Sequence, residues 1–247
     1  MIIERSMSDG WLSNSYLVAD RPGGHGVLID SGGPPEPIFE AIANYGVSIT
    51  HLLLTHHHQD HIVHNAAYVE RFGCEIWGHP AERPYCDDIQ HDLEDGDEIV
   101  SGDLRVKALL TPGHTVGMLA LVANDEAVFT GDTLFKGTVG GTLAPGHATY
   151  GDLKWSIMQV LMQLPKEMAV YPGHTDATTI GAEWDTNAFV RIWRGLDPEG
   201  AAPCTALGRE ATLVVRALDY DGGTKCWVRF ADNGADEIAP GSKVTGE

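Results

Sequence analysis

A histidine-rich segment directly after an apolar strand constrains this chain more than any other sequence feature. The segment T-H-H-H-Q-D-H follows the apolar run Leu52–Leu54. Its H-x-H-x-D-H pattern offers imidazole nitrogens and a carboxylate, the donors that suit zinc, iron and manganese. His56 and His58 are two residues apart, so in an extended turn both side chains point the same way, and Asp60 and His61 come from the turn that follows. The segment therefore predicts a metal site at the end of a strand.

Three more strand ends present a metal-ligand residue after an apolar run, each in a glycine-containing turn. In chain order they are His114 in TPGHT after residues 108–110, Asp132 in GDT after 127–129, and His174 in YPGHT after 168–170. Strand ends of αβ sheets converge on one crevice, so we expect the four turns to meet there. The neighbouring glycines allow the sharp turns and the close packing that such a site needs.

A single histidine after a strand is usually a hydrogen-bonded surface or core residue, and a lone Gly-Asp-Thr is usually only a turn. We give the histidines outside the pattern this ordinary interpretation: His25, His51, His57, His64, His79, His91 and His147. The joint pattern is different, because five histidines and two aspartates lie in four strand-end turns in one order. That combination favours one metal centre over seven unrelated residues.

The order of expected elements indicates a layered αβ architecture. Strands are expected at residues 16–19, 26–29, 49–54, 75–77, 104–110, 118–122, 127–129 and 168–170. Helices are expected from Pro35 to a stop at Gly46, over a segment with Ile62, Ala66 and Val69 on one face, and over 152–164 and 183–193. Mixed strands and helices in this order predict sheets covered by helices.

The composition changes near residue 195, where a Pro- and Gly-containing linker begins. Strands are expected at 212–218 and 224–230, and in the second of these Cys226, Val228 and Phe230 alternate with Lys225, Trp227 and Arg229, the period of a half-buried strand. We therefore divide the chain into a main domain, 1–198, and a linker with a small β meander, 199–247. A meander this short is marginal alone, so we expect it to cover the main domain or a second chain.

Charge and composition exclude several function classes. Lys and Arg number 16 against 35 Asp and Glu, a formal net charge of −19. Such a chain repels phosphate backbones and anionic membranes, which argues against a nuclease and against membrane binding. The start of the chain has no apolar leader segment, and no run approaches the roughly 18 apolar residues of a membrane span. We expect a cytoplasmic protein with a small-molecule substrate. Whether the protein forms a homo-oligomer stays open.

The four cysteines are scattered and include no C-x-x-C pair. In a chain of this length that spacing favours buried or free thiols over a disulfide framework.

The ordered set H-x-H-x-D-H, TPGHT, GDT and YPGH resembles the metallo-β-lactamase superfamily, in particular its glyoxalase II-like (hydroxyacylglutathione hydrolase-like) members. The resemblance covers roughly residues 10–190, and the segments 14–18 and 28–32 are similar to the opening strands of the family. It implies an α/β (α+β) fold, a four-layer αββα sandwich with the metals at one edge between the sheets. The β meander would be a small C-terminal extension of that fold.

Carried over by position, the resemblance implies two divalent metal ions, with zinc expected before iron or manganese. The implied ligands are His56, His58 and His114 for one ion, Asp60, His61 and His174 for the other, and Asp132 bridging both. Asp60 and Asp132 would serve catalysis through the hydroxide that the two ions hold. Asp132 argues against β-lactam hydrolysis, because the β-lactamases of the superfamily usually carry cysteine or serine at that place.

The function implied is that of a dinuclear metal-dependent hydrolase, whose bridging hydroxide attacks a thioester or a related ester of a small acid. Several alternatives stay open: a persulfide dioxygenase with a single iron, a lactonase, a thioesterase for carrier-bound acyl chains in a biosynthetic pathway, and a non-catalytic binding module on the same fold. The binding module is disfavoured because degenerate members are expected to lose ligands, whereas this chain has all seven.

Two departures from the glyoxalase II-like pattern lie on the substrate side. Gly141 stands where an arginine is expected, and Ile62 and Val63 follow D-H in place of two glycines. The thiol carrier therefore stays unassigned. Lys136 and Tyr150 are weak candidates for substrate contact.

Overall fold

A computed structural model describes residues 1–246, and the chain forms two compact units that each combine several segments. The first unit contains Met1–Leu110, Gly117–Gly131 and Val170–Thr175. The second contains Thr111–Val116, Asp132–Ala169 and the chain from Asp176 onwards. Within residues 1–246, no helix has both the length and the apolar character that crossing a bilayer requires.

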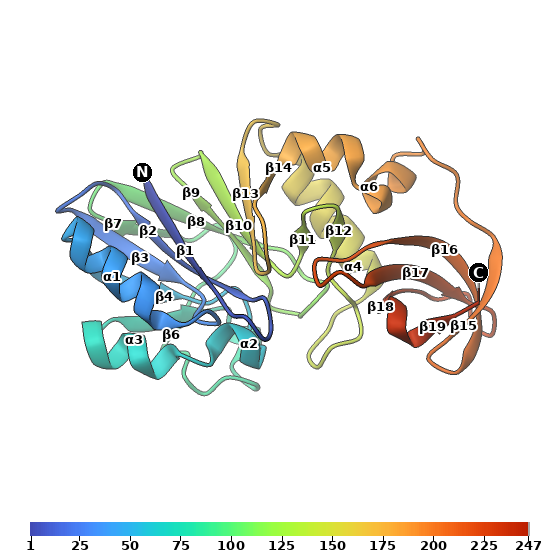
Figure 1. Ribbon diagram of the computed structural model, residues 1–247, viewed down its shortest axis with the longest axis horizontal. Coiled ribbons are helices and arrows are strands. Elements are labelled where there is room, and N and C mark those ends of the chain that lie inside the picture. Colours follow the sequence, from blue (N-terminus) through green and yellow to red (C-terminus); the bar gives the residue numbers. More distant parts are fainter. Residues whose placement is uncertain (247) are drawn as a thin grey trace. The chain divides into compact units, whose positions relative to one another are not determined.

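Two β-sheets form the body of the first unit (Figure 1). The first has the order β1-β2-β3-β4-β5-β6, with antiparallel pairs from β1 to β3 and parallel pairs from β3 to β6. In the second, β10, β9, β8 and β7 follow one another as antiparallel neighbours, and β13 lies next to β10. The strands are β1 Ile2–Met7, β2 Asn14–Ala19, β3 His25–Ile29, β4 Ser48–Leu53, β5 Glu75–Gly78, β6 His91–Asp92, β7 Glu98–Ser101, β8 Leu104–Leu110, β9 Leu119–Ala123, β10 Ala127–Gly131 and β13 Ala169–Pro172. All eight strands expected for this part of the chain are present.

The two sheets share an aromatic and aliphatic core. Every residue of β2, β9 and β10 is buried, as expected for strands covered on both faces. The ring of Tyr16 on β2 meets Phe129 on β10 edge-on at 5.0 Å between centroids, and Tyr171 stacks on Phe129 at 5.2 Å. These contacts join the sheets face to face and hold the ends of β10 and β13 close together.

Helices α1 (Pro35–Tyr45) and α3 (Asn65–Phe72) cover the outer face of the first sheet (Figure 1). Ile38 and Ile42 of α1 belong to one buried cluster with residues of β2, β3 and β4. As predicted, the helix begins at the prolines and stops at Gly46, whose φ of 66° is the left-handed conformation that glycine adopts without strain. The short 3-10 turn Pro80–Glu82 follows β5.

The helical segment expected around Ile62, Ala66 and Val69 differs from the prediction in two ways. It is broken into α2 (Gln59–Ile62) and α3, and Ala66 is exposed, while Asn65 and Tyr68 are buried. The amide of Asn65 accepts a hydrogen bond from Ser31 at 2.8 Å and donates one to Asp88 at 3.1 Å. A pattern of apolar residues cannot reveal an asparagine that is buried by its hydrogen bonds. The prediction therefore placed the buried face of the helix on the wrong residues.

The second unit contains the remaining helices, and both of its expected long helices are interrupted. Residues 152–164 were expected to be one helix, but α4 (Tyr150–Trp155) passes into a π-helical turn, Ser156–Val160, and a 3-10 turn, Leu161–Gln163. Residues 183–193 divide into α5 (Ile180–Thr186) and α6 (Ala188–Trp193). The break is at Asn187, whose side-chain oxygen accepts hydrogen bonds from the backbone N–H groups of Phe189 and Val190 in the first turn of α6. The short strands of this unit are β11 Leu134–Phe135, β12 Thr138–Val139 and β14 Thr178–Thr179.

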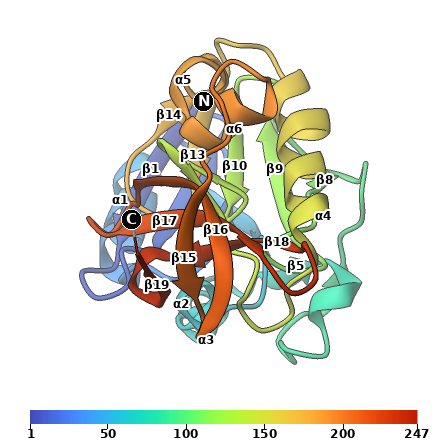
Figure 2. The same ribbon diagram turned by 90° about the vertical axis from the view of Figure 1, so that its right-hand side faces the viewer.

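The C-terminal part of the second unit is an antiparallel sheet in the order β18-β17-β16-β15-β19 (Figure 2). Its strands are β15 Ala202–Ala206, β16 Arg209–Leu218, β17 Thr224–Phe230, β18 Asp236–Pro240 and β19 Val244–Thr245, and a 3-10 turn, Gly241–Lys243, precedes β19. The two strands predicted here are therefore present, within a sheet of five.

The expectation that β17 is half-buried is wrong, because Lys225 and Trp227 are buried as well as the alternate residues. The ring of Trp227 packs on Tyr150 of α4 at 5.1 Å and lies 6.4 Å from Trp193 of α6. The ammonium of Lys225 forms an ion pair with Asp219 at 3.1 Å. Both faces of β17 are therefore covered, and the sheet packs on helices of its own unit.

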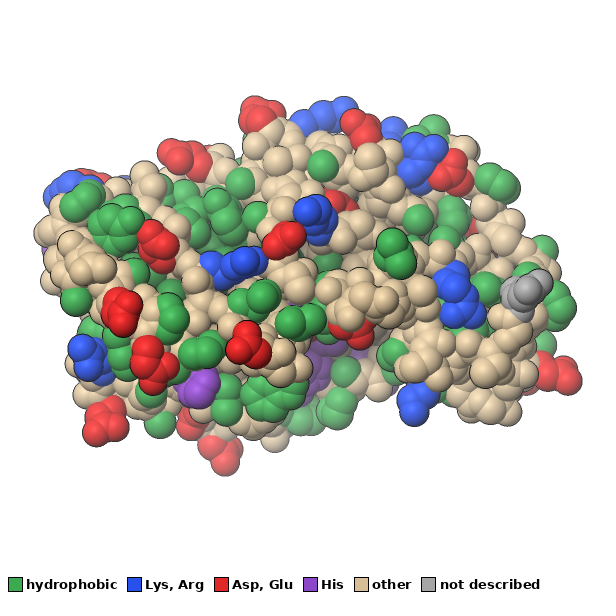
Figure 3. Space-filling view, in the orientation of Figure 1, with side chains coloured by type: hydrophobic (Ala, Val, Ile, Leu, Met, Phe, Trp, Pro, Cys, Tyr) green, Lys and Arg blue, Asp and Glu red, His purple; other side chains and the backbone are tan. Residues whose placement is uncertain are grey.

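The surface agrees with the acidic composition. On the face shown in Figure 3, Asp and Glu side chains are spread widely, and the Lys and Arg side chains lie singly between them. No basic stripe of the kind that tracks a phosphate backbone is present on this face.

Candidate metal centre

In the first unit, Asp60 and His61 of α2 lie beside His174, which follows β13. One oxygen of Asp60 lies 3.6 Å from Nε2 of His61 and 3.4 Å from Nε2 of His174, and the two Nε2 atoms are 3.4 Å apart. Both imidazoles are buried and the carboxylate is partly exposed. Three donor atoms from positions 113 residues apart in the chain therefore point at one another.

These separations fit a bound divalent ion. Ligand atoms at about 2.1 Å from a tetrahedral zinc are about 3.4 Å from each other, which is close to all three distances. The set of two imidazoles and one carboxylate is also one that zinc, iron and manganese accept. The donor chemistry and the spacing of this group thus meet the requirements for a metal site.

Asp30, directly after β3, holds His61 and the histidine-rich turn in place. Its carboxylate accepts hydrogen bonds from the backbone N–H of Thr55 at 2.8 Å and from the Thr55 hydroxyl at 2.7 Å. The same carboxylate lies 3.0 Å from Nδ1 of His61. Since Nδ1 is engaged there, Nε2 is the nitrogen presented to Asp60 and His174, the arrangement typical of metal-binding histidines.

Asp30 is a residue of this candidate site that was not among those predicted from the sequence. The sequence signal is its place directly after the apolar run 26–29. In the structure its φ is 53°, a conformation that aspartate tolerates better than most residues.

His174 is oriented in the same way, by backbone and side-chain groups of the first unit. Its Nδ1 donates to the backbone oxygen of Trp11 at 3.0 Å. The hydroxyl of Tyr16 donates to the backbone oxygen of Pro172 at 2.7 Å, and the amide of Asn14 donates to the same oxygen and to that of Thr175, each at 3.0 Å. Burial raises the pKa of Tyr16, so this hydroxyl keeps its proton and remains a donor.

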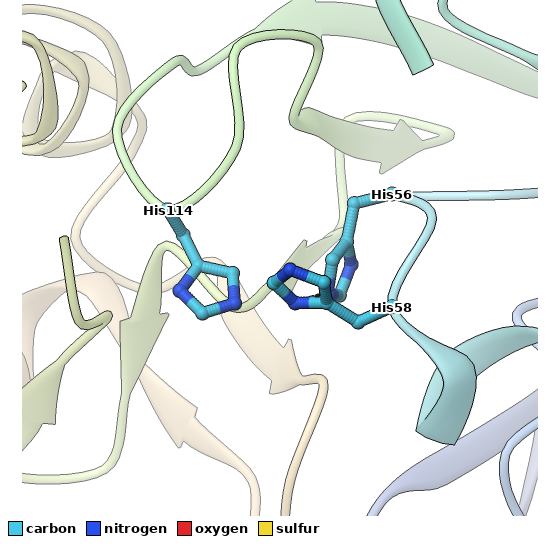
Figure 4. A group of neighbouring side chains, drawn as sticks. All are labelled: His56, His58 and His114. Carbon is cyan, nitrogen blue, oxygen red and sulfur yellow. Dashed lines mark hydrogen bonds between the residues drawn. The ribbon is translucent and has the colours of Figure 1, made fainter. Parts of the chain in front are cut away.

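His56 and His58 leave the turn after β4 on the same side. Nε2 of His56 lies 3.1 Å from Nδ1 of His58, and Nδ1 of His56 lies 3.0 Å from the hydroxyl of Thr55. Figure 4 draws these two rings close together, with His114 on the loop that follows β8. The two-residue spacing thus places both imidazoles where they can serve one ion.

His57 points elsewhere, as predicted. Its Nδ1 and its backbone N–H both bond to Glu82, and its ring stacks on Tyr85 at 4.4 Å. Among residues 1–246, His57 belongs to none of the groups of donor atoms that could hold a metal. Glu82 is 2% exposed and also accepts a hydrogen bond from the backbone N–H of Gly117 at 2.7 Å, so one buried carboxylate ties two loops together.

The predicted ligands His114 and Asp132 belong to the second unit. Nε2 of His114 lies 3.4 Å from a carboxylate oxygen of Asp132, and its Nδ1 donates to the backbone oxygen of Gly141 at 2.9 Å. The preceding Gly113 has a φ of 152°, and a Cβ there would lie 2.6 Å from Cα of Leu153 in α4. Only glycine fits this close approach, which explains the TPGHT motif.

The two weak candidates for substrate contact have other partners. The Tyr150 ring packs on Trp227, and its hydroxyl accepts a hydrogen bond from the Trp193 indole at 2.8 Å. Lys136 is exposed and lies 3.6 Å from a carboxylate oxygen of Asp176. Tyr150 is therefore a packing residue, and Lys136 is a surface residue in an ion pair.

Comparison with known families decides the relationship. The model of the metallo-beta-lactamase superfamily matches residues 8–174, a segment that contains all seven predicted ligands. The chain belongs to this superfamily. The predicted resemblance and the predicted α+β sandwich are both confirmed.

Relatives in this superfamily include proteins named as a hydrolase of hydroxyacylglutathione and as a metallo-beta-lactamase. The chain is 40% identical over 160 residues to a hydroxyacylglutathione hydrolase of Rhizobium etli, covering 64% of this chain and 60% of that protein. The chain thus spans about three fifths of the length of that relative. The crystal structure of the BLEG-1 B3 metallo-beta-lactamase has a TM-score of 0.71 at 25% identity and covers 76% of this chain and 99% of that one. TTHA1623, in a di-iron-bound form, has a TM-score of 0.62 at 33% identity and covers 72% and 94%.

Proposed function

We propose that this superfamily member is a dinuclear metal-dependent hydrolase that cleaves a thioester or a related ester of a small acid. The observation that carries the proposal is the Asp60–His61–His174 group, whose donor atoms are mutually spaced as ligands of one ion. The hydroxyacylglutathione hydrolase relative at 40% identity supports the choice of a thioester.

The seven predicted ligands would hold two ions. One would be held by His56, His58 and His114, the other by Asp60, His61 and His174, with Asp132 shared between them. When bound, such ions lower the pKa of water towards neutrality and polarise the carbonyl of the substrate. Zinc is our first choice of metal, and the di-iron-bound TTHA1623 keeps iron as the main competitor.

The chain's own residues have defined tasks in this proposal. Asp60 and Asp132 supply the negative charge that offsets two dications. Asp30 keeps Nε2 of His61 directed at the site, and the backbone oxygens of Trp11 and Gly141 do the same for His174 and His114. Fixed donors of this kind require no rearrangement during the reaction, which is how a preorganised site lowers a barrier.

The substrate proposal stops at the thioester and ester class. Gly141, at the place of the arginine of glyoxalase II-like sequences, presents its backbone oxygen to His114 and has no side chain for a glutathione carboxylate. Opening of β-lactams is disfavoured despite the fold shared with a B3 metallo-beta-lactamase, because Asp132 stands where such enzymes usually have cysteine or serine.

Metal content and oxygen dependence test the proposal together. Protein produced separately with zinc, iron or manganese is analysed for metal per chain, and each form is assayed for thiol release from small 2-hydroxyacyl thioesters in air and under nitrogen. We expect two ions per chain and hydrolysis at the same rate in both atmospheres.

Three results would refute it. Metal-supplemented, folded protein that contains no metal would remove the basis of the proposal. Turnover of a persulfide with oxygen uptake, lost under nitrogen, would identify a persulfide dioxygenase. Faster hydrolysis of lactones or of carrier-bound acyl chains than of any small thioester would transfer the assignment to one of those classes.

A further inference from the structure

The C-terminal sheet contacts the loop that precedes α4 at the buried Thr142, and the neighbouring Leu143 packs against the core of the sheet. The backbone N–H of Thr142 donates to the backbone oxygen of Ile238 on β18 at 3.1 Å, and the N–H of Ile238 donates to the Thr142 hydroxyl at 3.0 Å. The Thr142 hydroxyl in turn donates to the carboxylate of Glu237. Thr142 is fully buried, so these three bonds fix both its backbone and its side chain against β18.

The residues just before Thr142 contact both predicted ligands of the second unit. The backbone oxygen of Gly141 accepts the Nδ1 hydrogen of His114 at 2.9 Å. The N–H of Gly140 donates to the backbone oxygen of Thr133 at 3.1 Å, and a Cβ on Gly140 would lie 2.0 Å from the backbone oxygen of Asp132. A shift of this loop would therefore change the orientation of the His114 imidazole and the packing around Asp132.

We propose that Thr142 and Glu237 are positioning residues for His114, and that the C-terminal sheet thereby sets the geometry of one metal position. From the sequence, this sheet was expected only to cover the main domain or a second chain. The match to the superfamily ends at residue 174, so β18 with Glu237 lies outside the matched segment. Thr142 lies inside the matched segment, so the proposed pair joins the two parts of the chain. The inference rests on the proposed function, since it takes His114 as a ligand.

The expected effect follows from the chain of bonds. Residues that orient a metal-binding histidine typically change metal affinity by 10–100-fold when replaced. Thr142 acts one residue beyond the oxygen that His114 bonds, so the low end of this range, about tenfold, is expected. The effect should be largest for the ion that His114 would hold, because His114 is the side chain that Gly141 contacts directly.

Thr142→Val is the direct test, because valine keeps the shape of the side chain and the backbone bond to Ile238 while removing the hydroxyl. Metal-free protein is titrated with Co²⁺ alone, and both the affinities and the visible d–d absorption spectrum are recorded. We expect about tenfold weaker binding of one Co²⁺ and a changed spectrum, both restored by Thr142→Ser. Glu237→Gln should shift the spectrum in the same direction, and it keeps the test decisive if Thr142→Val does not fold.

Thr178→Val is the matched control. Thr178 donates to Glu183 at 2.8 Å in the same unit, so this variant also loses a threonine–glutamate hydrogen bond. The inference would be overturned if both Thr142→Val and Glu237→Gln kept the wild-type Co²⁺ affinity and spectrum. It would also be overturned if Thr178→Val changed them equally. In either case, two ions per chain and thioester hydrolysis in the wild type would leave the proposed function intact. A wild-type protein that binds no Co²⁺ would overturn both.

Discussion

Replacing Glu82 should destabilise the folded chain more than replacing any exposed acidic residue. Its buried carboxylate accepts hydrogen bonds from two backbone N–H groups, those of His57 at 3.1 Å and Gly117 at 2.7 Å, and from the His57 ring. Glu82→Ala leaves these donors buried without that acceptor. We therefore expect a large loss of stability from a residue outside the predicted ligand set.

The magnitude follows from the two backbone groups. A buried donor that loses its acceptor costs about 1–3 kcal/mol, so two of them cost roughly 2–6 kcal/mol, and we expect about 4 kcal/mol for Glu82→Ala. Glu82→Gln keeps the volume and one acceptor oxygen, and should cost about half as much. Either loss is a large share of the roughly 5–15 kcal/mol by which such proteins are stable.

The free energy of unfolding is measured by urea denaturation, with tryptophan fluorescence as the signal. EDTA is present so that metal binding adds nothing to the apparent stability. Glu75→Ala is the control, because Glu75 pairs with His91 at 2.9 Å but is 61% exposed, and such pairs contribute at most about 1 kcal/mol. If Glu82→Ala lost no more stability than Glu75→Ala, the claim that this buried carboxylate ties the two loops together would be wrong.

Three further outcomes are expected. His58→Ala should lower metal affinity by more than about 100-fold, which exceeds the effect of residues that only orient a ligand. His57→Ala should keep the wild-type metal content. Equal losses in the two variants would mean that the assignment of His58 inside the site and His57 outside it is wrong. Burial lowers the pKa of His51 below its usual 6.5, so the unfolded chain takes up that proton first as the pH falls, and the stabilisation present above pH 6.5 is lost below it. His51→Gln should therefore flatten the fall in unfolding free energy between pH 7 and 5, and parallel curves would contradict this. A thiol reagent should label no cysteine rapidly in the folded protein and four in denaturant, because burial raises the pKa of every thiol. One rapidly labelled thiol in the folded protein would refute the burial of the four cysteines, Cys74, Cys86, Cys204 and Cys226.

The sequence alone was enough to predict the strands that are distinct apolar or alternating runs, though not β1 or β7, and to name side chains that could donate to a metal. Both are local properties. A strand buried on both faces is a short apolar run, and a donor atom belongs to its residue type wherever that residue lies. The spacing of His56 and His58 likewise determines their common direction as soon as the turn is extended.

Helix limits and buried faces were predicted less well where distant partners decide them. Asn187 interrupts the helix expected at 183–193, and its amide donates to the backbone oxygen of Thr138 at 3.1 Å, 49 residues away in the chain. Asn65 is buried because Ser31 and Asp88 bond its amide, and Trp227 is buried because α4 and α6 cover it. In each case a polar or aromatic side chain contacts residues that lie far away in the sequence, so the neighbouring residues do not reveal its burial.

The sequence determined which side chains could bind a metal, and only the tertiary structure decided which nitrogen of each histidine faces the site. Asp30, the backbone oxygen of Trp11 and that of Gly141 each engage one Nδ1, and they come from positions 31, 163 and 27 residues away from the histidines that they orient. An imidazole has two nitrogens of nearly equal donor strength, so its own identity cannot choose between them. A hydrogen bond from elsewhere in the chain makes that choice, and folding has to bring it there.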